Sequence, residues 1–509
     1  MKTCINIVVL FSLLFFTSCE DWLDLKPETQ STEDELFSTV DGYRSVLNGL
    51  YKSMASADLY GRELSFGMLT CMSQQYDLTS NVMSEQKYLF AEEFEYENTK
   101  LKPTVDKVWK SGFNVIANAN NLIQNLEKTS PDIFAMGDVE RNLMLGEAYA
   151  CRAMMHFDLL RLFAPAPISG DQGSYVPYVE KFPDIVANGI GVDAFLEKVI
   201  KDLVYAQELT IDFDTTDAGK CLMKTNKSRF ENVLGSASTA GYAEANAYDD
   251  FFKGRGYRLN YYSISAMLAR VYMYAGRYDD ALEMVNIVKK YNMISDSSYG
   301  SIIQGVNLET SENLKMLSSV LFALYNEKAY TALGIDSYFA KKLSVGTGKI
   351  FVMKKSLFEA WNDEDESSLD PRYNTLKYLV NDVYPISGKY YASETESVRN
   401  KNVTLVPMFR YAELEYIRAE CYARQQDWTQ VSSILRGIRM SRGMRNEVSV
   451  NNWNDFVKML VCDARREWIG EGQMFFMYKR LNVDVDFGEV KRPLSKAESV
   501  LPIPDNQSM

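Results

Sequence analysis

Two segments of this chain carry the same pattern of small and aromatic residues, 150 residues apart. The first has Ala269, Tyr272, Gly276, Tyr278 and Ala281, and the second has Ala419, Tyr422, Gln426, Trp428 and Val431. This spacing is typical of a tetratricopeptide repeat, in which two antiparallel helices cross at small residues and aromatic rings fill the groove. The matches stay in register, which argues against two unrelated amphipathic hairpins. We therefore expect Tyr272 and Tyr422 to be largely buried.

Helical pairs of this kind bury their apolar faces only by stacking, so further pairs are needed. Apolar residues at helical spacing supply them at 37–55, 105–126, 139–163 and 192–209. The predicted fold class is mainly α, a tetratricopeptide-like scaffold of about four helical pairs. The pairs are expected near residues 33–128, 139–209, 257–291 and 407–442. No Gly- or Pro-rich linker divides the chain, so residues 19–509 are predicted to form a single domain.

Long stretches between the pairs do not follow helical spacing. They cover residues 72–99, 213–256 and 292–406. Loops this long in a compact protein are usually functional. Disorder is the alternative, but the many aromatic residues in these stretches argue against it. We therefore expect irregular loops that carry the function.

The N-terminus has the features of a bacterial lipoprotein signal. Lys2 precedes an apolar run over residues 5–16, which is shorter than the about 20 residues that span a bilayer. Thr17-Ser18-Cys19 follows, and small residues that end on a Cys form a lipobox. We predict a signal peptide over residues 1–18 and lipidation of Cys19. The alternative is an ordinary cleaved signal with an incidental Cys.

Composition excludes several classes of function. The net charge of −13 disfavours nucleic acid as a partner, because an acidic chain repels phosphates. It equally disfavours an anionic membrane surface, so the lipid would have to provide the anchor. The chain has one histidine, His156, on an apolar helical run, which excludes a zinc site built on several His and argues against a Ser-His-Asp hydrolase. We expect no cofactor, no metal site and no enzymatic activity.

Several motifs, read in order, resemble the SusD/RagB family of nutrient-binding outer-membrane lipoproteins. At the N-terminus these are Cys19-Glu-Asp-Trp-Leu-Asp-Leu-Lys-Pro27, Phe37 and Asn48-Gly-Leu-Tyr51. Helical segments follow at Gly146-Glu-Ala148 through Phe163, Ala266 through Gly276, and Phe409 through Glu420. Asp370-Pro-Arg372, Arg465-Arg-Glu467, Gly470-Glu-Gly472, Lys479-Arg480 and Leu501-Pro-Ile-Pro504 complete the order. The chain departs from the family at Trp468, Gln473 and Tyr478, where Phe, Arg and Asp are more usual.

The resemblance implies a surface lipoprotein that captures an oligosaccharide and delivers it to a SusC-like TonB-dependent outer-membrane transporter. It also implies the alternative of the RagB branch, which is capture of peptides for the same kind of transporter. Glu20-Asp21 resembles the acidic tag that sends such lipoproteins to the outer face. The implied location is the outer membrane, lipid-anchored and facing the cell exterior.

The ligand residues are expected in the long loops. Sugar rings lie on aromatic faces, while polar side chains bind their hydroxyls; a peptide would need hydrogen-bond partners more than stacking faces. The family often places ligand contacts between its first two helices, which corresponds to residues 72–99. The candidates are Tyr76, Asp77, Asn81 and Tyr88 in that loop, with Tyr330 and Trp361 in 292–406. We expect Tyr76 or Trp361 to stack on the ligand and Asp77 and Asn81 to bind hydroxyls; packing within the protein is the alternative for each aromatic residue.

Overall fold

A computed structural model describes residues 33–505 except 80, 185–187, 231–247, 292, 298, 344–347, 359–365, 367, 445–447 and 489. The predicted signal peptide, the lipidation site Cys19 and the candidate Trp361 lie outside the described residues. The chain divides into a unit of residues 1–43 and a unit of residues 44–509. The first contains α2 (Glu33–Leu36) and the start of α3 (Val40–Met54).

The internal repeat consists of two helical hairpins whose helices begin at positions 150 residues apart. The helices are α12 (Tyr261–Tyr274) and α13 (Tyr278–Lys290), then α19 (Tyr411–Arg424) and α20 (Trp428–Ser441). Each turn passes through one left-handed residue, Gly276 at φ 75° or Gln426 at φ 60°. Tyr272 is 7% exposed, as predicted. Tyr422 is only partly buried, although it packs against the core formed by α19, α20 and the helices after them.

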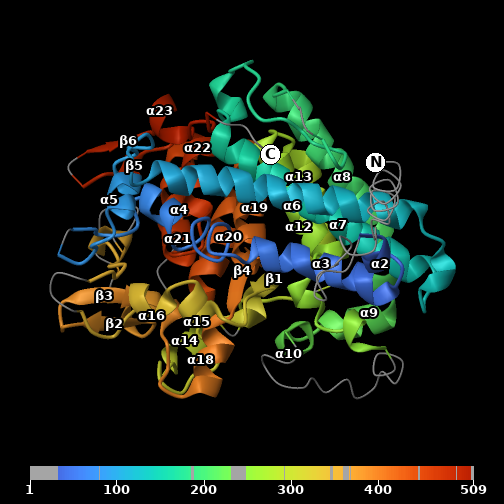
Figure 1. Ribbon diagram of the computed structural model, residues 1–509. Coiled ribbons are helices and arrows are strands. Elements are labelled where there is room, and N and C mark those ends of the chain that lie inside the picture. The colour runs from blue at the N-terminus through green and yellow to red at the C-terminus, as the bar shows by residue number, and fades with distance from the viewer. Residues whose placement is uncertain are drawn as a thin grey trace, which may run out of the picture. The chain divides into compact units, whose positions relative to one another are not determined.

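The long helices pack side by side in chain order. α6 (Lys102–Lys128), α7 (Asp138–Phe163) and α8 (Val192–Asp214) contact one another in succession, and α8 contacts α12. Likewise, α13 contacts α19, which contacts α21 (Trp453–Glu467). Figure 1 shows this row of helices from α6 to α13. The prediction of a mainly helical scaffold of stacked pairs is confirmed.

α7 lies between α6 and α8 in this row. Nearly every side chain from Leu143 to Phe163 is buried, because α6 lies on one side and α8 on the other. Its buried charges are paired. Arg152 binds Asp202 with nitrogen–oxygen distances of 2.8 and 2.7 Å, and Glu147 accepts from Arg255 at 2.6 Å. A helix that is covered all round needs such partners, since an unpaired buried charge is costly.

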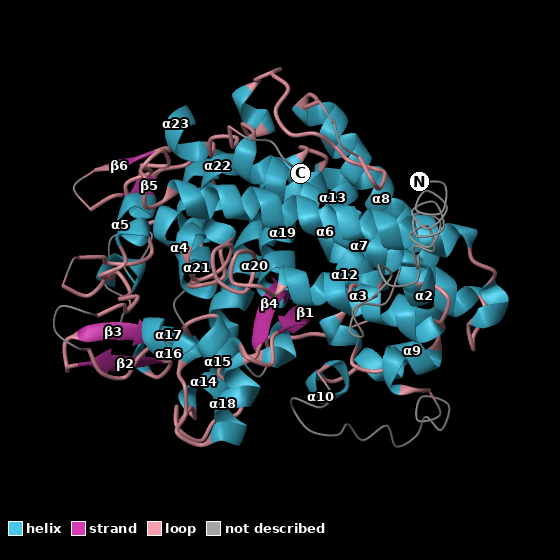
Figure 2. Cartoon of the chain, in the orientation of Figure 1, coloured by secondary structure: helices cyan, strands magenta, loops and turns pink. Residues whose placement is uncertain are grey.

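The stretches between the pairs contain short elements. Figure 2 shows the strands as small pairs beside the helices. The strands pair antiparallel as β1 (Val320–Tyr325) with β4 (Leu405–Arg410), β2 (Lys377–Val380) with β3 (Tyr384–Ser387), and β5 (Val485–Asp486) with β6 (Lys491–Arg492). The other helices are α4 (Met68–Met72), α5 (Gln86–Glu92), α9 (Asp217–Met223), α10 (Asn226–Arg229), α14 (Tyr299–Gln304), α15 (Ala329–Ala332), α16 (Ile335–Tyr338), α17 (Pro371–Asn374), α18 (Glu396–Val403), α22 (Gln473–Leu481) and α23 (Lys496–Ser499).

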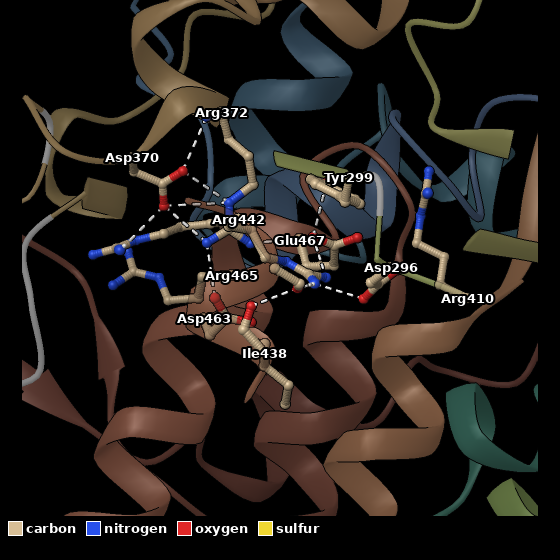
Figure 3. A network of polar contacts seen from close by, with 12 residues as sticks. Asp296, Tyr299, Asp370, Arg372, Arg410, Ile438, Arg442, Asp463, Arg465 and Glu467 are labelled. Carbon is tan, nitrogen blue, oxygen red and sulfur yellow. Dashed lines mark hydrogen bonds and ion pairs between the residues drawn. The ribbon is translucent and has the colours of Figure 1, made fainter. Parts of the chain in front are cut away.

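Several motifs that carry the family resemblance meet in a buried network of ion pairs (Figure 3). Arg372 binds Asp370 and Asp463 at 2.8 Å each, and Glu467 at 3.1 Å. Arg442 also pairs with Glu467, at 3.2 Å, and Tyr299 donates to this carboxylate at 3.0 Å. These contacts tie α21 to α14, α17 and α20. Two of the motifs, Asp370-Pro-Arg372 and Arg465-Arg-Glu467, therefore hold the scaffold together.

The network keeps its central carboxylates ionised. Burial alone would raise the pKa of Glu467, but the positive charges of Arg442 and Lys389 outweigh it and hold that pKa far below its usual range. The pKa of Asp463 is lowered in the same way, against its burial, by Arg372 and Arg442. Charges in this position are stable only while all partners are present.

Candidate functional site

The structure brings the predicted ligand loop together with part of the stretch 292–406. The backbone of Asp77 donates to the Val352 carbonyl at 2.8 Å, and Ile350 donates to Val82 at 2.9 Å. Ser84 donates to the Gly348 carbonyl at 2.7 Å. Residues 75–79 and 81–84 therefore lie beside residues 348–354 in an irregular ladder. We call the two sides of this ladder the paired segments.

The aromatic candidates of the predicted ligand loop, Tyr76 and Tyr88, are packed inside the protein. Tyr76 is 2% exposed, and its ring stacks on Phe351 with centroids 4.5 Å apart. Tyr88 is fully buried and meets the Phe351 ring edge-on at 5.0 Å. Asp77 and Asn81 are exposed. Only the polar candidates of this loop therefore face solvent in this conformation.

Tyr330 lies in α15, which carries none of the backbone contacts of the paired segments given above. Its ring is partly exposed, and the Arg399 guanidinium lies 4.6 Å from its centroid. This cation–π contact joins α15 to α18 and occupies one face of the ring. The contact given for the Tyr330 ring is with Arg399 and not with Tyr76, and Trp361 lies outside the described residues.

A cleft of about 670 Å³ opens next to the paired segments, between α21, α22 and the β5–β6 hairpin. Its volume is in the range of small-molecule sites. The wall combines an aromatic ring with amide, carboxylate and cationic groups. Its polar and aromatic members are Ser356, Trp453, Asn454, Lys458, Arg465, Tyr478, Asn482, Asp484, Asp486 and Lys491.

Local sequence signals position these side chains. Asn452 caps α21 by accepting from the Asp455 backbone at 3.0 Å. Asn454, Lys458, Val461 and Arg465 then fall three or four residues apart, on one face of the helix. α22 begins after Gly472, which has a φ of 73°. A Cβ at this position would lie 2.1 Å from the Leu64 carbonyl oxygen, so only glycine fits. The residue that follows the last turn of α22 is Asn482, and its φ of 50° turns the chain sharply toward β5.

The cleft adjoins the predicted ligand loop. The Gln75 side chain donates to the Arg465 carbonyl at 2.7 Å, and Lys354 donates through its backbone to Gln75 at 3.1 Å. Ser356, two residues further on, lies on the cleft wall. The Phe94 and Phe487 rings meet at 6.2 Å, which joins the loop to the β5–β6 hairpin. The paired segments and the cleft thus form one continuous region of the molecule.

The sequence reasoning missed Trp453, Asn454, Asn482 and Asp484. Two signals in the sequence point to this region. Trp453 is one of six Trp in the chain and stands in the polar run 451–455. Tyr478, also on the cleft wall, departs from the residue that is more usual in the family. The other two departures, Trp468 and Gln473, line a small pocket of about 50 Å³ beside Tyr274. That pocket is far smaller than the cleft of about 670 Å³.

The one histidine of the chain is packed inside the protein. His156 is buried, its Nδ1 lies 3.0 Å from the Arg152 carbonyl, and its Nε2 accepts from the Val179 backbone at 3.0 Å. Burial holds the pKa of the imidazole well below its ordinary value. No group of three or more His, Cys, Asp or Glu within the described residues is arranged to hold a metal ion. No helix in the described part of the chain has the length and apolar character to cross a membrane.

Comparison with known proteins finds this helical architecture and parts of this sequence in SusD-like proteins. Residues 21–227 match the profile of a SusD-like family described as "Starch-binding associating with outer membrane". SusD-like protein P38 of Formosa agariphila is 20% identical over 95% of this chain and 92% of its own length. SusD-like protein P2 of the same organism is 24% identical, but over 48% of this chain and 43% of its own length.

Solved structures share the fold across most of the chain. A SusD-like carbohydrate binding protein from Bacteroides vulgatus superposes with a TM-score of 0.65 at 16% identity, covering 92% of this chain and 95% of that one. A laminarin binding SusD-like protein superposes with a TM-score of 0.57 at 14% identity, covering 87% and 91%. These comparisons confirm the resemblance to the SusD/RagB family, and the chain has the SusD-like fold.

Proposed function

We propose that this protein captures an oligosaccharide outside the cell and delivers it to a SusC-like TonB-dependent transporter. In this proposal Cys19 carries the lipid that anchors the chain in the outer membrane, and the chain is a binding protein without catalytic activity. The names of its relatives support capture of a glycan, since they describe starch-binding, laminarin binding and carbohydrate binding proteins. The transporter and the lipid anchor rest on the family resemblance and on the lipobox.

The observation that carries the proposal is the mixed wall of the cleft. A sugar presents apolar C–H faces together with hydroxyl groups, so it needs an aromatic surface beside hydrogen-bonding groups. Trp453 is partly exposed at the cleft, with Asn454, Asn482 and Asp484 exposed on the same wall. We propose that the glycan occupies this cleft and that Asp77 and Asn81, exposed on the paired segments, extend its binding surface.

The test is calorimetry on the purified full-length chain in detergent with a panel of oligosaccharides and peptides. The variant Asn482→Gly removes an amide from the cleft but suits the left-handed backbone there. Asn381→Gly is the matched control, because Asn381 is also exposed at φ 51° but lies in the β2–β3 turn. Asp77→Ala tests the extension of the surface.

A glycan that binds the parent and the Asn381→Gly protein equally, but the Asn482→Gly protein several-fold more weakly, supports the proposal. Loss of one hydrogen bond worth about 1.4 kcal/mol would weaken binding about tenfold. If peptides bind and no oligosaccharide does, peptide capture replaces glycan capture. If a glycan binds all the variants with equal affinity, the site is misplaced.

A further inference from the structure

The cleft carries an excess of positive charge in an acidic protein. Three cationic side chains line it, Lys458, Arg465 and Lys491, against two carboxylates, Asp484 and Asp486. The whole chain has a net charge of −13. Such a local reversal of sign attracts a ligand of opposite charge more than the average surface does.

Arg465 is the cation whose place in the wall is best defined. It projects from α21, and its guanidinium is mostly buried, which strengthens its electrostatic interactions. Its nearest carboxylate is loosely paired, because Nη2 lies 3.9 Å from the Asp486 oxygen, beyond hydrogen-bond distance. The contact with the Ser356 hydroxyl is also long, at 3.5 Å. The fork therefore keeps donor capacity for a planar anion.

Asp486 is held by other partners. Its carboxylate accepts from the Gly488 backbone at 2.9 Å. It therefore has a hydrogen bond that does not depend on Arg465. Lys458 is exposed at the cleft. It lies on the same face of α21 as Cys462, four residues later, and Arg465, seven residues later. Lys458 and Arg465 thus approach the cleft from one helix, two turns apart.

We propose that the cleft selects acidic oligosaccharides, those with carboxylate or sulfate groups, over neutral ones of the same length. This inference rests on the proposed function and adds the class of its ligand. The anion lies against Arg465 and Lys458, while Asn482 and Asp484 take sugar hydroxyls. A charge-assisted contact is about twice as strong as a neutral hydrogen bond, so the preference is expected to be about tenfold or more.

The test uses pairs of oligosaccharides that differ only in charge. Each uronic-acid oligomer is compared with its methyl ester, and each sulfated oligomer with its desulfated form, by calorimetry at two salt concentrations. The expected result is tighter binding of one or more charged members, with affinity that falls as salt screens the attraction. Whether carboxylate or sulfate members bind distinguishes the two sources of the anion.

Two variants place the effect in the cleft. Lys458→Gln should weaken binding of the acidic member several-fold and leave its neutral partner unchanged. Lys110→Gln, at an exposed lysine of α6 outside the cleft, should change neither. Equal or tighter binding of neutral partners overturns this inference and leaves glycan capture intact. Equal effects of the two lysine variants also overturn it, and binding of no oligosaccharide at all overturns the proposed function itself.

Discussion

Glu467 shows at the scale of one residue how the scaffold depends on buried charge. Its carboxylate pairs with Arg372 and Arg442 and accepts a hydrogen bond from Tyr299, and these partners come from three different elements. Glu467→Gln removes the negative charge that Arg372 and Arg442 share, although Arg372 keeps Asp370 and Asp463 and Arg442 keeps Asp296 as partners. Because breaking a buried pair typically costs 3–5 kcal/mol, we expect a loss of about that size in the free energy of unfolding.

Urea unfolding measures this loss, with Glu208→Gln as the control. Glu208 is an exposed glutamate of α8, and its replacement should have little effect. If the Glu467→Gln protein unfolds at the same urea concentration as the control, the network does not have the stabilising role described above.

Glu92 should make stability depend on pH in the opposite sense from the network. Its side chain is 18% exposed and lies 3.2 Å from the Lys354 ammonium. Burial raises the pKa of its carboxyl to about 7, despite the charge of Lys354. The folded state therefore holds this proton more tightly than the unfolded state, whose pKa is about 4.3. The stabilisation is full below about pH 4.3 and is lost as pH rises through 7.

Glu92→Gln should remove that loss. Relative to the parent, the variant should gain up to about 3 kcal/mol in stability between pH 5 and pH 8. Glu93→Gln, at the exposed neighbour, should show no such gain. Urea unfolding at the two pH values measures both; a parent-to-variant difference that is the same at pH 5 and pH 8 would contradict the assignment.

At the scale of the elements, the two repeat hairpins have the same kind of turn but a different residue at its left-handed position. Arg277 donates to the Tyr272 carbonyl at 2.8 Å, and Asp427 donates to Tyr422 at 3.0 Å, so both helices end with the same hydrogen bond. The left-handed residue is glycine in the first turn but Gln426 in the second. Side chains are disfavoured in this conformation.

Gln426→Gly should therefore stabilise the protein by about 0.5–1 kcal/mol. Gln425→Gly is the control, since Gln425 has φ −81° and glycine there should destabilise. Thermal unfolding of the two variants beside the parent measures the difference. If both variants shift the transition in the same direction, the turn is not strained at Gln426.

At the scale of the whole molecule, the prediction concerns where the chain is held. Cys19→Ala should release the protein from the outer membrane, because in the proposed function acyl chains on Cys19 are the anchor of this acidic chain. Fractionation of cells that lack the partner transporter measures this. Replacing Glu20 and Asp21 by Ala should keep the anchor but reduce exposure to protease added to whole cells. A Cys19→Ala protein that still sediments with the outer membrane would exclude the lipid as its anchor.

The sequence by itself determined the helices, because helical periodicity and the residues that end helices act locally. Apolar residues at helical spacing mark α6, Pro103 lies at its start, and the 150-residue offset of the repeat is the offset between the starts of its helices. The family motifs also lie in order along the chain, and sequence alone is enough to read them.

Only the tertiary structure decided which side chains remain free for a ligand. Tyr76 looks like a stacking residue in the sequence, but Phe351, 275 residues away, covers its ring. Arg465 belongs to a motif whose neighbours Arg466 and Glu467 point into the buried network, yet its own side chain reaches the cleft. Exposure depends on which distant segments pack together, and no local spacing of residues encodes that choice.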